Sequence, residues 1–364
     1  MEGSTMAFDP IQEDCLRLIL EAMRRDRIPL DNPTYIQNSA DAFRDDPASL
    51  IHADRDRSFH LVAKATEIID YRVPFLSDEA RIEQESQQAE NYLREAVELD
   101  QNNWDAKRML TALDAETNDA YVSYLLDNRD AVEHELAELA ASANDPYSRE
   151  FAGDLGQRPY LRWLAALASR SLIAGQYRLS LDTVEQSLAF APQDPAGVRH
   201  TGMLALAKLE ASPEDVKSFQ DRHAVAYQTA SPDYHRPHCA ERKPDAWTLL
   251  STMSLAYRSF DFTGAERALR TLLSIYPHAA QSLFYQAEFP DGLFCRVNVE
   301  PGSDDELVLA ISEATPLLQE GFGTPENAGF SNWVAEHELV QSGLDEQVDR
   351  GRVRASAPRA GGDN

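Results

Sequence analysis

Apolar residues recur at intervals of three and four positions along most of the chain, a spacing that places them on one face of an α-helix. The first such pattern covers 10–25, and a longer one starts at Ser77, where two acidic residues follow a good N-cap. Further helices are predicted at 104–113, 120–126, 130–141, 160–174, 178–190, 196–209, 213–224, 245–258, 263–275, 278–287, 304–320 and 332–342. The short alternation at 292–299 is too isolated to build a sheet. The sequence therefore predicts an all-α protein.

The helical periodicity is irregular near the N-terminus, regular in the middle and absent at the end, which predicts that the chain has three parts. Residues 1–76, in which short helices at 35–44 and 48–69 follow two prolines, are expected to form an irregular N-terminal cap. Residues 77–344 form the main helical array, with a loop at 142–157 and an insertion without periodicity at 227–243. Residues 345–364 combine arginines with Gly, Ala, Ser and Pro, which predicts a disordered, locally basic tail.

A repeated unit lies inside the main array. In 162–195 the turn Gly175-Gln176-Tyr177 separates two predicted helices, and the second carries small residues such as Ser180 and Ser187 before stopping at Pro192. In 245–277 the turn is Asp261-Phe262, followed by Ala265 and Leu269 at the same spacing and by Pro277. The small residues let two helices approach closely, and the proline ends the second helix. Both segments predict a helical hairpin.

Two weaker copies follow the same register. Ala89, Leu93 and Ala96 reproduce the second helix, with Gln101 in the place of the proline. The segment 195–228 keeps a small residue, Gly202, but lacks the aromatic at the turn. The distances between matching positions are not multiples of about 34 residues, so the hairpins do not form a regular array.

These hairpins resemble the tetratricopeptide repeat (TPR) family. The resemblance implies an α-α superhelix, that is, a TPR-like solenoid of antiparallel helical hairpins preceded by the irregular cap. The aromatics Trp104, Trp163, Trp247, Tyr177 and Phe262 would then fill the interfaces between helices. The segments 194–199 and 301–306 also resemble bacterial relatives of the suppression-of-tumorigenicity TPR proteins.

The resemblance also implies a function, since first helices of such repeats line a concave face that holds a peptide or a partner helix. We therefore expect a non-enzymatic scaffold or adaptor that binds proteins. Carried onto this chain, the groove would present Arg162, Ser169, Arg199, Met203, Leu250, Ser254 and Tyr257. Family members that grip a C-terminal carboxylate use paired Lys and Asn, which these positions do not supply.

Charge narrows the choice of partner. The formal net charge is −27 at pH 7, which opposes binding to nucleic acid and to anionic membranes. The mixed apolar and arginine groove favours an amphipathic or partly basic peptide, and the chain's own segment 345–364 is one such candidate. The odd, widely spaced Cys15, Cys239 and Cys295 fit a reducing compartment, and no secretory signal precedes them, so we expect a cytoplasmic protein.

Motifs for catalysis are weak. His134-Glu135 lacks the second histidine of a zinc-protease helix, and no phosphate-binding loop is present. Soft metal ligands gather only at His235, His238 and Cys239, where His223 or Cys295 could complete a zinc site. We expect no metal and no cofactor. A metal-assisted enzyme using this insertion and a structural homodimer remain the alternatives to a protein-binding scaffold.

Overall fold

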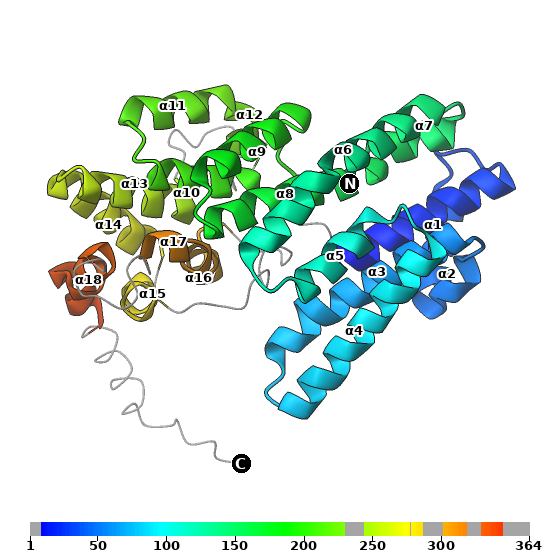
Figure 1. The fold of residues 1–364 in the computed structure, drawn as a ribbon, viewed down its shortest axis with the longest axis horizontal. Coiled ribbons are helices and arrows are strands. Elements are labelled where there is room, and N and C mark those ends of the chain that lie inside the picture. The colour runs from blue at the N-terminus through cyan, green and yellow to red at the C-terminus, as the bar shows by residue number, and fades with distance from the viewer. Residues whose placement is uncertain (1–8, 230–243, 277, 287–300, 319–328, 345–364) are drawn as a thin grey trace, which may run out of the picture. The chain divides into compact units, whose positions relative to one another are not determined.

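The structure is a computed structural model that describes residues 9–229, 244–276, 278–286, 301–318 and 329–344. Every regular element in these ranges is helical, which confirms the all-α class (Figure 1). The chain divides between Arg199 and His200 into two compact units, called unit 1 and unit 2. The predicted alternation at 292–299, the segment 345–364 and most of the insertion at 227–243 lie outside the described residues.

Unit 1 is made of helices that follow the predicted periodicity. Their bounds are α1 (Pro10–Asp26), α2 (Pro33–Asp45), η1 (Pro47–Leu50), α3 (Asp54–Thr66), η2 (Glu67–Arg72), η3 (Val73–Phe75), α4 (Glu79–Leu99), α5 (Trp104–Asp114), α6 (Asn118–Ser142), α7 (Pro146–Gly153), η4 (Leu155–Gln157), α8 (Arg158–Ile173) and α9 (Tyr177–Phe190). Local chemistry sets the ends: the Asp9 side chain accepts a hydrogen bond from the Gln12 amide at the start of α1.

The core of unit 1 joins the predicted cap to the predicted array. Leu61 and Ile68 from the cap side are buried together with Leu93, Ala96 and Met109 from α4 and α5. Ser58 strengthens this contact, because its hydroxyl donates to the Ala96 carbonyl at 2.7 Å. The sequence boundary between residues 76 and 77 therefore falls between helices that share one hydrophobic core.

Three local predictions in unit 1 were wrong in detail. The N-cap of α4 is Asp78, whose carboxylate accepts from the first-turn amides, and not Ser77. The segments 120–126 and 130–141 form one continuous helix, α6. The predicted loop at 142–157 contains α7, which starts at a capping box between Asp145 and Ser148. α7 is only eight residues long and is flanked by Asn144, Asp145 and Asp154, so the segment has the composition of a loop and is too short for periodicity to reveal the helix.

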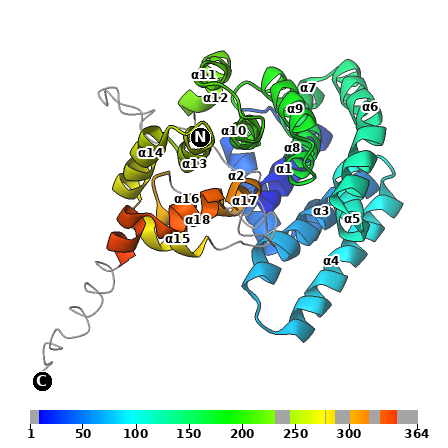
Figure 2. The same cartoon turned by 60° about the vertical axis from the view of Figure 1, so that its left-hand side comes forward.

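Unit 2 contains the remaining helices. They are α10 (Val198–Lys208), which starts at the unit boundary, α11 (Pro213–Arg222), α12 (Ala224–Thr229), α13 (Ala246–Arg258), α14 (Phe262–Ile275), α15 (Ala279–Tyr285), α16 (Asp304–Glu313), α17 (Thr315–Leu318) and α18 (Gly329–Glu336). Residues 338–344 continue as a further helical stretch after α18. Figure 2 shows α13 beside α14 and α15 next to α18.

The two best sequence matches are helical hairpins, α8–α9 in unit 1 and α13–α14 in unit 2. Ser180 is buried, and its hydroxyl donates across the first hairpin to the Ala168 carbonyl at 2.8 Å. Ala265 and Leu269 are likewise buried in the second. The predicted small residues therefore do allow close packing. The assignment of these hairpins to the TPR family stays a prediction.

Candidate binding surface

The predicted groove residues lie on α8, α10 and α13, and most are not accessible. Buried side chains in this set are Arg199, Met203, Leu250 and Ser254. Ser169 and Tyr257 are partly exposed. The structure thus leaves Tyr257 and Ser169 as surface residues of the predicted set, while Arg162 is held by the ion pairs described next.

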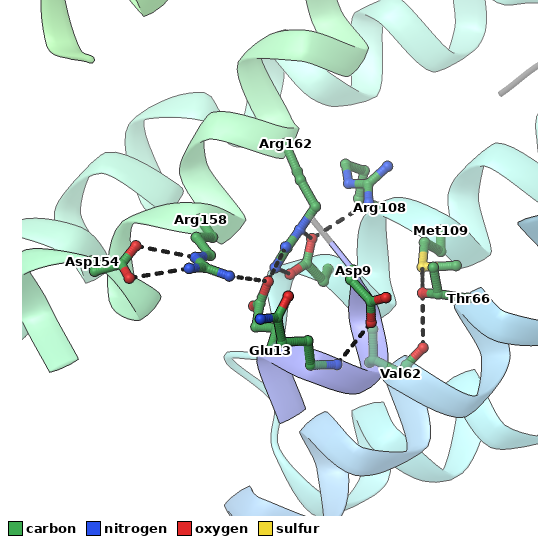
Figure 3. A network of polar contacts seen from close by, with 11 residues as sticks. Asp9, Glu13, Val62, Thr66, Arg108, Met109, Asp154, Arg158 and Arg162 are labelled. Carbon is green, nitrogen blue, oxygen red and sulfur yellow. Dashed lines mark hydrogen bonds and ion pairs between the residues drawn. The ribbon is translucent and has the colours of Figure 1, made fainter. Parts of the chain in front are cut away.

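Arg162 is the centre of a buried ion-pair network in unit 1 (Figure 3). Its guanidinium donates to both carboxylate oxygens of Glu13, at 2.7 and 3.1 Å, and to both of Asp105, with the Nε bond at 2.9 Å. Glu13 comes from α1 and Asp105 from α5, so one side chain of α8 ties three helices together. Such two-pronged contacts are the strongest form of ion pair.

Neighbouring arginines complete the network. Arg158 contacts Glu13 at 3.5 Å and holds Asp154 through two bonds of 3.0 and 3.1 Å, while Arg108 contacts Asp105 at 3.4 Å. Burial raises the pKa of the Asp105 carboxyl, but the Arg162 and Arg108 guanidiniums outweigh burial and hold that pKa below its usual range. The charges are matched inside the network, so within the fold Arg162 acts as a clamp between α1, α5 and α8.

Arg199 is also engaged within the fold. Its guanidinium contacts Asp194 at 2.9 Å, and the Asp194 carboxylate accepts the amides of Val198 and Arg199 at 2.8 and 3.1 Å. Burial raises the pKa of Asp194, although the Arg199 charge and these amides oppose the rise. The pair fixes the start of α10.

Unit 2 carries an aromatic surface of which the groove prediction contained only Tyr257. We call the following residues the aromatic cluster: Tyr257, Phe260, Phe262, Phe330, Trp333 and His337. The rings form a connected series, with centroid distances of 6.3 Å from Phe260 to Phe262, 5.7 Å on to Tyr257 and 5.4 Å on to Trp333. Edge-to-face contacts at these distances are favourable for aromatic rings.

The cluster runs from the core to solvent. Phe330 is buried and Tyr257 and Trp333 are partly exposed, whereas Phe262 is 49% and Phe260 80% exposed. The prediction that Phe262 fills a gap between hairpins is therefore wrong, while Trp163 and Trp247 do lie in the core. An aromatic series that is anchored at one end and bare at the other has the composition of a binding hot spot.

The backbone at Phe260 adds a second observation. Phe260 has φ of +62° and ends α13 in a Schellman motif, in which its amide donates to Tyr257 and the Asp261 amide to Ala256. In the α8–α9 hairpin, α8 ends in the same motif, with Gly175 at φ +78°. Left-handed backbone disfavours any side chain with a Cβ. The matching left-handed residue is Arg27 after α1 and Glu210 after α10, both polar. Of these four helix ends, only the one after α13 has an aromatic residue, Phe260.

Exposed acidic residues are close in sequence to the aromatic cluster. Asp261 separates the two most exposed phenylalanines, and Glu336 and Glu338 are exposed beside Trp333 and His337 in sequence. Arg258, at the end of α13, is paired with Glu210 at 3.2 Å. Within the described ranges no ion pair engages Asp261, Glu336 or Glu338, and exposed rings next to carboxylates in the chain attract Lys or Arg side chains.

Sequence reasoning found part of this surface. Tyr257 was predicted as a groove residue and Phe262 as a turn aromatic, and the structure brings them into contact. Phe260 was missed, although an aromatic two residues before Phe262, at a helix end where Gly or Asn is usual, is a readable signal. Phe330 and Trp333 could not be joined to the hairpin by any sequence pattern.

A different cluster of titratable groups lies in the interior of unit 2. The Trp247 indole donates to the Glu313 carboxylate at 2.7 Å, and the His200 ring stacks on Trp247 at 3.9 Å. Burial raises the pKa of Glu313 to about 7, with the Trp247 hydrogen bond opposing the rise. Glu306, from the same helix, accepts the Ala246 amide at 3.4 Å and packs near Tyr276. These groups support the packing of α13 on α16.

The described part of the chain offers no site for a metal. No group of His, Cys, Asp and Glu within it is arranged to hold an ion, and His235, His238, Cys239 and Cys295 lie outside the described ranges. Nor does any helix there have the length and apolar character to cross a membrane. Comparison with protein-family models, curated proteins and solved structures found no match to this chain.

Proposed function

We propose that the protein is a non-enzymatic scaffold that binds a basic, amphipathic segment of another protein on the aromatic cluster. The observation that carries the proposal is Phe260, a phenylalanine that is 80% exposed and held in the left-handed region. The left-handed backbone costs folding free energy, and a ring that is so exposed gains little by burial to offset that cost. Aromatic side chains in such positions are typical of interface hot spots.

The chemistry of the cluster sets the kind of partner. Exposed rings can pack against apolar side chains of a partner. Their faces also attract Arg and Lys, and each such cation–π contact contributes about 0.5–2 kcal/mol to the binding free energy. The carboxylates of Asp261, Glu336 and Glu338 favour the same cations, and the net charge of −27 opposes nucleic acid and anionic membrane surfaces. The partner is thus expected to be a peptide or helix with basic and apolar faces.

The helical hairpins form the frame that presents this surface, which is the role that the TPR resemblance implies. Tyr257 and Phe262 are held by the α13–α14 hairpin, and α18 supplies Phe330 and Trp333. The cytoplasm is the compartment we propose, because an odd number of widely spaced cysteines is not the pattern of a disulfide framework and Cys15 is a free thiol.

The test uses fluorescence anisotropy with a defined probe, a fluorescein-labelled amphipathic peptide that has arginines on one helical face and leucines on the other. Phe260→Gly removes the exposed ring and relieves the left-handed strain, so the fold should gain about 1 kcal/mol while the affinity for the probe falls at least about tenfold. Phe260→Ala should weaken binding equally without the gain in stability.

Two controls make the result specific. Phe75 is 70% exposed in unit 1, so Phe75→Ala removes a comparable surface ring and should leave the affinity unchanged. A probe in which glutamates replace the arginines should not bind. If Phe260→Gly binds the arginine probe as tightly as the unaltered protein, the aromatic cluster is not the binding surface.

A further inference from the structure

The aromatic cluster is followed closely by a basic stretch of the same chain. Trp333 and His337 are in ring contact, and residues 338–344 continue from them as a helical stretch in which Val340 is buried. A helical stretch of this length advances about 10 Å. Residue 344, where the described part ends, is therefore near the cluster.

Residues 345–349 include the acidic Asp345, Glu346 and Asp349, and the positive charge that the cluster attracts begins at Arg350. Arg350, Arg352 and Arg354 alternate with Gly351 and Val353, and Arg359 follows. From 345 to 350 an extended chain spans about 20 Å, so the arginines can reach the cluster from residue 344. The carboxylate of Asp261, between Phe260 and Phe262 in the chain, is exposed and has no ion pair within the described residues.

The spacing of the arginines matches the spacing of the rings. In an extended segment, every second side chain points to the same side, at intervals of about 6.6–6.8 Å. The ring centroids of Phe260, Phe262 and Tyr257 are separated by 6.3 and 5.7 Å. Successive guanidiniums of an Arg-x-Arg-x-Arg segment can therefore lie over successive rings. The chain already uses this contact in unit 1, where the Arg17 guanidinium lies 3.0 Å from the Phe59 ring centroid.

We propose that residues 350–354 bind to the aromatic cluster of their own chain and compete there with the basic partner. The inference rests on the proposed function, because it assigns an internal competitor to the same surface. A few exposed cation–π contacts are weak between separate molecules. Attachment by a short linker supplies a millimolar effective concentration, which is enough for weak contacts to be populated and still displaced by a partner that adds apolar contacts.

Photo-crosslinking of the full chain tests the contact directly. A variant with p-benzoylphenylalanine at position 260 should, on irradiation, form a product of single-chain mass whose crosslink maps to residues 350–359 by mass spectrometry. The variant in which Arg350, Arg352, Arg354 and Arg359 are all changed to Gln should lose this product. The same photoprobe at Phe75 should give no crosslink to 350–359.

A binding measurement separates this proposal from the proposed function. In the Arg→Gln variant the arginine probe should bind about two- to fivefold more tightly, because the internal competitor is gone. A crosslink between two chains, a crosslink that survives the Arg→Gln changes, or an unchanged affinity would each overturn the internal competitor. The proposed function fails separately, only if Phe260→Gly leaves probe binding intact.

Discussion

Arg162 gives the sharpest test of how the sequence should be interpreted. As a groove residue it would contribute to partner binding, whereas the structure makes it the clamp between α1, α5 and α8. Arg162→Met deletes the charge and keeps an apolar stem of similar length. If Arg162 lines a groove, the substitution should weaken partner binding. If Arg162 is a clamp, the substitution should destabilise unit 1.

The magnitude follows from the contacts. Removing one partner of a buried ion pair costs about 3–5 kcal/mol, because the remaining charge stays buried without compensation. Glu13 and Asp105 are 5% and 2% exposed, so both carboxylates would lose their main counter-charge. Arg158 at 3.5 Å from Glu13 and Arg108 at 3.4 Å from Asp105 remain. We therefore expect the lower end of the range, about 3 kcal/mol.

Because the chain has two compact units, a single melting curve does not report on unit 1 alone. Native-state hydrogen exchange, measured by mass spectrometry, reports on each unit separately. Peptides from α1, α5 and α8 report the stability of unit 1, and peptides from α13 and α14 are the internal reference. The control is Arg94→Met, which breaks the exposed pair between Arg94 and Glu90 and should cost at most about 0.5 kcal/mol.

A double-mutant cycle completes the measurement. Glu13→Gln combined with Arg162→Met should show a coupling free energy of at least about 1 kcal/mol, because each change removes the same contact. The reasoning is refuted if Arg162→Met lowers the protection of unit 1 by less than about 1 kcal/mol and instead weakens binding of the arginine probe.

Two further predictions concern single positions. The pKa of Glu313 is raised to about 7 by burial, so the folded state holds this proton more tightly than the unfolded state, and the stability of unit 2 should fall as pH rises from about 4.5 to 7. Glu313→Gln keeps an acceptor for Trp247 and should remove the Glu313 contribution to this slope, leaving that of Glu306 and gaining about 1–3 kcal/mol at pH 8 in urea titrations followed by exchange on α13 and α16. At Gly175, a Cβ would meet only the Tyr177 hydroxyl at 3.9 Å, so Gly175→Ala tests the backbone alone and should cost unit 1 about 1 kcal/mol. If Gly175→Ala leaves the stability of unit 1 unchanged, the backbone at this position does not need φ of +78°. A loss of stability much larger than this would show that the substitution disturbs more than the backbone conformation.

The helices could be predicted because their periodicity is local. Burial of Leu93 and Ala96, or of Ala265 and Leu269, follows from spacing within one helix and needs no knowledge of the partner helix. Helix ends were less certain, since Ser77 and Asp78 are both good N-caps and only the backbone selects Asp78. The short α7 was missed because its residues are equally suited to a loop.

The groove residues could not be placed in the same way, because burial of a polar side chain depends on distant partners. Arg162 binds Glu13 across 149 residues of sequence, and no pattern around Arg162 indicates a carboxylate there. Met203 and Leu250 are apolar and suit either a groove or a core, and the structure buries both. A register carried over from a repeat family fixes which face a residue occupies, but not whether another helix covers that face.

Arg162 and Phe260 show why composition alone misleads about function in this chain. An arginine is usually a surface residue, yet every prong of Arg162 meets a carboxylate inside unit 1, and the fold itself accounts for its presence. A phenylalanine is usually a core residue, yet Phe260 is exposed, in a backbone conformation that glycine adopts in the matching hairpin. Replacing Phe260 with glycine should therefore improve folding, so folding does not explain the phenylalanine. The proposed contact with a partner would explain it, and the exposed Asp261 beside Phe260 and Phe262 favours a cationic segment as that partner.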